Sequence, residues 1–198
     1  PRSTLFPYTT LFLSRDTKTI VIMKKFFAIA ILALVTLSMN AQDFKKFRFG
    51  PTAGLNVSKV SGGGADMAIG FHAGARAEYN FNDNVFLGSG LLLSQKGFKI
   101  GATQTAGYLE IPINAGYRYN FNDNFAMFGE VGPYVGIGIY GKNSYFDVAK
   151  RFDMGLGFAV GCEISKFQVR VGYELGLTKV FDGGGKNRNL FVGVAYMF

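Results

Sequence analysis

The stretch FAMFGEVGPYVGIGIY, from Phe125 to Tyr140, alternates between two kinds of residue along its length. One set of alternate positions is apolar and comprises Met127, Val131, Val135, Ile137 and Ile139. The other set comprises Glu130, Gly132, Tyr134, Gly136 and Gly138. Because successive side chains of a strand point to opposite faces, this period of two predicts a β-strand with one apolar and one polar, glycine-rich face.

Similar runs follow one another from Phe47 to Phe198, with turn residues between them. The expected strands are Phe47 to Val60, Ala68 to Phe81, Val85 to about Lys96, Tyr108 to Tyr119, Phe125 to Tyr140, Phe152 to Ile164, Phe167 to Lys179 and Asn189 to Phe198. No amphipathic helix of useful length follows Ala41. The chain contains 27 Gly, 21 Phe and 10 Tyr, and this abundance of aromatic residues also favours strands.

The connections between these strands alternate in length. Tight turns are expected at 82–84, 122–124 and 165–166, and longer connections at 61–67, 97–107, 141–151 and 181–188. The hexamer YNFNDN occurs twice, at Tyr79 to Asn84 and at Tyr119 to Asn124, as expected for repeated hairpins. Short turns at one end and long loops at the other are typical of transmembrane barrels. The sequence therefore predicts an all-β fold, an eight-stranded antiparallel up-and-down transmembrane β-barrel.

The same alternation also fits a soluble barrel, in which the apolar face points inward. A membrane barrel is inverted, because lipid cannot satisfy polar groups. Three features favour the membrane barrel: the polar face is rich in glycine, as suits a narrow lumen; its charges are mixed in sign; and aromatic residues lie near strand ends, where a membrane girdle would be. These aromatic residues are Tyr79, Tyr117, Tyr119, Tyr173, Tyr196 and Phe198.

Nine charged residues fall on the face predicted to line the lumen. They are Arg48, Arg76, Glu78, Glu110, Arg118, Glu130, Glu163, Arg170 and Glu174. We interpret them as a salt-bridged plug, because eight strands enclose a space only just wide enough for side chains. The alternative interpretation is a transport path through a narrow channel.

The sequence predicts no catalytic, cofactor-binding or metal-binding residues, and hence no enzyme. A membrane-embedded lipid hydrolase is the alternative, with His72 and either Ser89 or Ser94, but no motif fixes their geometry and a structural histidine is favoured. The glycine-rich segments at Ser61 and Asp182 do not lie between a strand and a helix, as a phosphate loop would. Cys162 is expected to face lipid as a small apolar residue.

The first 41 residues are interpreted as lying outside the barrel. Lys24 and Lys25 followed by the apolar run Phe26 to Leu37 predict a signal peptide at residues 23–41, because the run is too short to span a bilayer. Residues 1–22 are interpreted as an assembly artefact or a poorly ordered leader, since Thr4 to Ser14 resembles a translated sequencing adapter. The expected barrel domain, 42–198, has 16 Lys and Arg against 12 Asp and Glu, scattered without the clustering that binds nucleic acid.

Export with cleavage after Ala41 is the first testable consequence. Mass spectrometry of the protein from isolated membranes should show a mature chain that begins at or close to Gln42. A mature chain that retains Phe26 to Leu37 would contradict the signal-peptide interpretation.

Several short motifs, taken in order, resemble the PorT-like outer-membrane β-barrel family of Bacteroidetes. They are AGLNVS (53–58), LLLSQKG (91–97), YLEIPI (108–113), GPYVG (132–136), FDMGLGFAVG (152–161) and YELGLT (173–178). The resemblance implies a protein of the bacterial outer membrane. The expected partners are outer-membrane lipid, the outer-membrane assembly machinery through the strand ending at Phe198, and a protein partner at the loops. The family's namesake belongs to the gliding and type IX secretion apparatus, a role that barrel resemblance alone does not transfer.

Overall fold

The structure is a computed structural model that describes residues 46–61, 66–100, 102–141 and 149–198. The predicted signal peptide at 23–41 and the predicted artefact at 1–22 lie outside these residues. Within them, no helix is long and apolar enough to cross a membrane.

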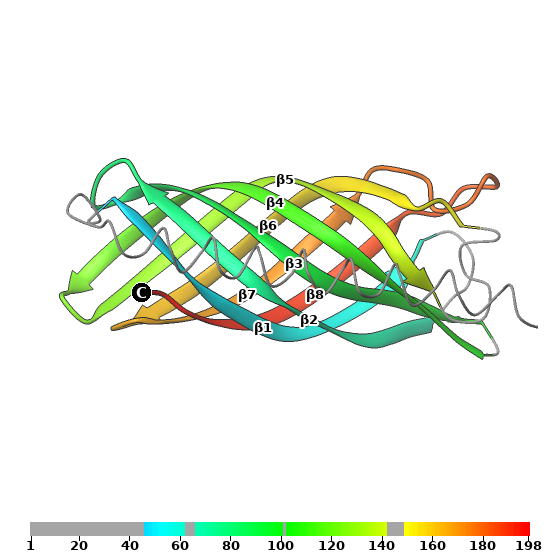
Figure 1. The fold of residues 1–198 in the computed structure, drawn as a ribbon, viewed down its shortest axis with the longest axis horizontal. Helices are drawn as coiled ribbons and strands as arrows, with labels where there is room; N and C mark the ends of the chain where they lie inside the picture. Colours follow the sequence, from blue (N-terminus) through cyan, green and yellow to red (C-terminus); the bar gives the residue numbers. More distant parts are fainter. Residues whose placement is uncertain (1–45, 62–65, 101, 142–148) are drawn as a thin grey trace, which may run out of the picture. The chain divides into compact units, whose positions relative to one another are not determined.

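Eight antiparallel strands form one closed barrel, in which each strand pairs with its neighbours in sequence and the last pairs with the first (Figure 1). The strands are β1 (Phe47–Val60), β2 (Asp66–Asn80), β3 (Val85–Ile100), β4 (Ala102–Asn122), β5 (Phe125–Gly141), β6 (Phe152–Ile164), β7 (Phe167–Gly176) and β8 (Asn187–Tyr196). The predicted fold class is confirmed.

The two ends of the barrel differ, and we call them the turn end and the loop end. At the turn end, β2–β3, β4–β5 and β6–β7 are joined by short turns, and the C-terminus lies there as well (Figure 1). The repeated hexamer forms two of these turns. The Asn82 side-chain oxygen accepts hydrogen bonds from the backbone N–H groups of Asn84 and Val85, and Asn122 does the same for Asn124. Asparagine favours such turns because its side chain can bond nearby backbone groups.

The prediction of a long loop at 97–107 is wrong. Here β3 and β4 continue as a paired hairpin, with Gly97 opposite Thr105 and Ile100 opposite Ala102. The polar and glycine residues that indicated a loop still pair through their backbones, and Phe98 is buried in an apolar cluster at the loop end. Apolar packing therefore outweighs the loop-like composition of this segment.

The outer surface of the barrel is apolar and its interior is polar. Ile69 is 74% exposed and Val160 is 66% exposed, whereas Arg76 and Glu78 are 2% and 1% exposed. An apolar outer surface would be costly in water, but it suits a surrounding lipid phase. A closed barrel also suits lipid because its strands satisfy their backbone hydrogen bonds with one another.

Outward-facing aromatic side chains ring the turn end. Tyr79 lies against Phe81, Tyr119 against Phe121, and Tyr196 against Phe198, with ring centroids 4.9–5.2 Å apart. Amphipathic rings of this kind collect at membrane–water interfaces. Tyr173 does not belong to this ring, because it lies within β7 and packs against Phe158 of β6.

Candidate functional site

The barrel interior carries two clusters of charged side chains. The first, which we call the turn-end network, comprises Arg48, Arg76, Glu78, Arg118, Glu130, Glu163, Gln168 and Arg170. Glu78 is its centre: its carboxylate accepts hydrogen bonds from the guanidinium groups of Arg48 and Arg118, at 2.7 Å each, and of Arg76, at 2.8 Å. The network contains four arginines and three glutamates. Its buried charges lie in direct contact with charges of opposite sign.

An aromatic stack supports this network. The Arg118 guanidinium lies 4.7 Å from the centre of the Phe86 ring, and Phe86 packs edge-on against Phe128. The Phe86 ring occupies the space over Gly116, where any Cβ atom would clash with it. A luminal glycine is therefore required at this position so that the aromatic ring can hold the arginine.

The second cluster lies nearer the loop end, and we call it the loop-end network. It comprises Lys96, Glu110, Asp153 and Glu174, with Tyr134, Thr178 and Asn189. The Lys96 ammonium lies 2.8 Å from Glu174 and 4.4 Å from the centre of the Tyr134 ring, and it also contacts Glu110. One buried ammonium group thus forms ion pairs with three carboxyl groups. The interior is therefore divided into an arginine-rich part and an acid-rich part.

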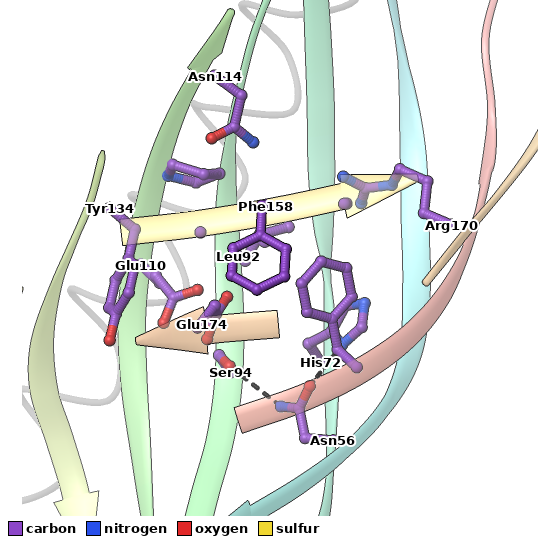
Figure 2. Close-up of a pocket in the computed structure, with 14 residues that line it drawn as sticks. Asn56, His72, Leu92, Ser94, Glu110, Asn114, Tyr134, Phe158, Arg170 and Glu174 are labelled. Carbon is purple, nitrogen blue, oxygen red and sulfur yellow. Dashed lines mark hydrogen bonds between the residues drawn. The ribbon is translucent and has the colours of Figure 1, made fainter. Parts of the chain in front are cut away.

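A small cavity of about 30 Å³ lies between the two networks (Figure 2). Arg170 borders it from the first network, and Glu110 and Glu174 border it from the second. Since one water needs about 10–15 Å³ of such volume, the cavity has room for about two waters. It is far smaller than a site for an organic ligand.

The histidine that sequence analysis singled out lies beside this cavity. His72 Nδ1 is 2.9 Å from Asn56 Oδ1, and Asn56 donates a hydrogen bond of 3.1 Å to Ser94 Oγ (Figure 2). Asn56 therefore bridges His72 and Ser94. All three side chains are buried in the lumen, away from lipid.

Apolar residues gather at the loop end. This apolar cap comprises Val60, Phe98, Ala106, Tyr108, Ala149 and Val180, with Phe181 packed against it. The β7–β8 connection contributes Val180, which is 3% exposed, and Phe181, whose ring packs edge-on against Phe98 at 5.8 Å. This connection thus turns inward and covers the loop-end network with apolar side chains.

The predicted luminal residues are found where the alternation placed them. All nine charged residues of the predicted plug lie inside the barrel, as do His72 and Ser94, whereas Ser89 and Cys162 lie on outward-facing positions of β3 and β6. Sequence analysis missed Lys96. Its signal was available, because Lys96 shares the luminal parity of Ser94 in the same strand. No group of metal-ligating side chains occurs among the residues that the structure describes.

A closed eight-stranded barrel with an apolar outer face and a charged interior defines an outer-membrane β-barrel protein. The chain belongs to the family described as outer membrane protein beta-barrel domain, whose model matches residues 40–182. This family places the protein in the bacterial outer membrane. No curated protein matches the chain.

Several solved structures are similar to this chain. Neisserial surface protein A is 17% identical, with a TM-score of 0.51, over 77% of this chain and 97% of that one. OprG from Pseudomonas aeruginosa is 12% identical, with a TM-score of 0.50, over 77% and 96%. Ail, the attachment invasion locus protein of Yersinia pestis, is 18% identical, with a TM-score of 0.44, over 77% and 99%. At these identities the likeness concerns the fold alone.

Proposed function

We propose that the protein is a non-enzymatic outer-membrane barrel with a closed lumen that acts through its loop end. The observation that carries this proposal is the filled interior of the described barrel: two ionic networks and an apolar cap occupy it, and the cavity between the networks measures only about 30 Å³. By the usual orientation of such barrels, the loop end is extracellular and the turn end periplasmic. The surface available for a partner protein is then the outer rim and its loops.

The networks support a closed lumen because opening them would be costly. Water or a solute could pass only by separating groups such as Glu130 and Arg170, which are 3.0 Å apart and almost fully buried. Removing one partner from a buried ion pair typically costs about 3–5 kcal/mol. A transport path would instead need a continuous row of waters.

The alternative of a lipid hydrolase lacks a suitable arrangement. An acyl-transferring serine must lie within hydrogen-bond reach of its base and open to the substrate. Ser94 is bridged to His72 through Asn56 inside the lumen, and the Ser89 hydroxyl donates to the Pro112 carbonyl oxygen at 2.9 Å. Neither serine therefore meets both requirements.

Planar-bilayer recordings test the closed lumen. We expect the purified protein to give no steady conductance at moderate voltage and salt, because buried ion pairs and the apolar cap occupy the described lumen. The folded state of the sample is checked by the shift in gel mobility between heated and unheated protein. Reproducible conductance steps whose number rises with the amount of folded protein would contradict the proposal and favour the narrow channel.

We propose two further roles. The PorT-like motifs support a role as a structural or secretion-associated component. The genes that lie beside this one test that role: a cluster of secretion genes supports it, and an unrelated neighbourhood argues against it.

We also propose that the assembly machinery recognises β8 through Phe198, whose exposed ring lies 5.6 Å from that of Phe49. Phe198→Ala should then reduce the amount of barrel in the outer membrane without changing refolding in vitro.

A further inference from the structure

Three cations lie together on the outside of the barrel at the loop end, where β1 meets β8. Lys59 of β1 is directly opposite Arg188 of β8, so the two side chains point to the same, outward side. Lys186, two residues before Arg188, has the same outward parity, and its backbone continues the pairing through Ser61. We call Lys59, Lys186 and Arg188 the rim cations.

The rim cations have no acidic partner among the described residues. Every ion pair of the described loop end uses other cations, namely Lys96 in the lumen and Lys150, which is 3.0 Å from Asp182. The adjoining segment 62–65 consists of three glycines and an alanine, and so supplies no charge. Like charges directly opposite each other across two strands are destabilising. An anion from outside the chain would remove this repulsion.

The surface next to the rim cations shows what kind of anion fits. Towards the turn end, the same two strands present Leu55, Leu190 and Val192 to the outside, between 44% and 61% exposed. A ligand that covers both surfaces must have an apolar part and an anionic head. Since the loop end faces the outer leaflet, the ligand that meets both conditions is an anionic lipid of that leaflet.

We propose that the rim cations bind the phosphate group of an outer-leaflet lipid whose acyl chains lie on the apolar surface of β1 and β8. One guanidinium group and two ammonium groups suit a phosphate, because charge-assisted hydrogen bonds to its oxygens are strong. The guanidinium group can also bind two phosphate oxygens at once. This site goes beyond the proposed function and does not depend on whether the lumen conducts or which protein the loops bind. It depends on the orientation of the barrel in the membrane.

The test measures lipid retention by native mass spectrometry of the full-length mature protein in a neutral detergent. The probes are dioleoyl phosphatidic acid and dioleoyl phosphatidylcholine, offered together in equal amounts. We expect the wild-type protein to retain the phosphatidic acid preferentially. The variant Lys59→Gln/Arg188→Gln should lose this preference, by about fivefold for each cation removed. The conservative variant Lys59→Arg should bind as the wild type does.

The matched control removes two other cations from the same end of the barrel. Lys99 and Lys179 are both exposed at the loop end, and Lys99→Gln/Lys179→Gln changes the net charge by the same amount. Equal losses in both double variants would mean that total charge, and no particular site, attracts the lipid, which would overturn the proposal. Displacement of phosphatidic acid by inorganic phosphate at equal concentration would also overturn it, because the acyl chains would then contribute nothing. Heat-dependent gel mobility confirms that each variant is folded.

Discussion

Replacing Glu78 with alanine should lower the free energy of unfolding by about 3–5 kcal/mol, or prevent folding altogether. The carboxylate accepts hydrogen bonds from three arginines in the barrel interior, and its removal leaves their charges buried without that partner. The loss should be measured by urea unfolding in phospholipid vesicles. Because the damage is electrostatic, Glu78→Gln should also be destabilised although it preserves the size of the side chain.

The control for this prediction is Asp83→Ala, which removes an acid from the exposed turn between β2 and β3. Surface changes of this kind usually alter stability by less than about 0.5 kcal/mol. A loss below about 1 kcal/mol for Glu78→Ala would show that the turn-end network does not hold the lumen closed.

A charge on the outer face should be the second large perturbation. Val171 lies in the middle of β7 and points outward, 45% exposed. Placing an arginine near the centre of the bilayer costs about 2–4 kcal/mol in barrels of this class, and the cost falls to about 0–1 kcal/mol near the interfaces. Val171→Arg should therefore fold poorly in vesicles.

The matched control for this prediction is the same substitution at a different depth in the membrane. Leu177 follows β7 at the loop end and is also exposed, so Leu177→Arg should cost much less than Val171→Arg. Urea titrations of both variants in the same vesicles measure the difference. Equal costs, or an unchanged stability of Val171→Arg, would mean that this face does not meet the acyl chains.

The alternation of residues predicted the strands and the contents of the lumen because it reflects a strong physical constraint. A strand that separates lipid from a packed interior must change character at every residue, as in β5. The hexamer repeats likewise predicted their turns, since Asn82 and Asn122 carry the local hydrogen bonds that form them. Each of these signals comes from residues that lie close together in the chain.

The missed features depend on contacts between distant segments. The hairpin at 97–107 is polar enough to look like a loop, but its two strands pair with each other and Phe98 packs in an apolar cluster and against Phe181. The bridge from His72 through Asn56 to Ser94 joins three strands whose registers are not determined by any one of them. The opposition of Lys59 and Arg188 depends in the same way on the pairing of the first strand with the last.

The proposed closed lumen and the proposed lipid site at the rim cations together would let the barrel act without a channel or an active site. The interior holds the shape through buried ion pairs, and the outside and the loop end remain free to contact lipid and protein. Both parts depend on one assignment, namely that the apolar face of every strand meets lipid.

Labelling of position 171 tests that assignment most directly. In a Cys162→Ala background, the variant Val171→Cys is labelled with a fluorophore while unfolded and then folded into vesicles, and Asp83→Cys in the exposed turn serves as the control. We predict that a quencher carried on lipid acyl chains quenches the label at position 171 and that iodide in the water does not, with the opposite result at position 83. Quenching at position 171 by iodide alone, from a protein that remains monomeric and soluble without detergent, would contradict the membrane barrel.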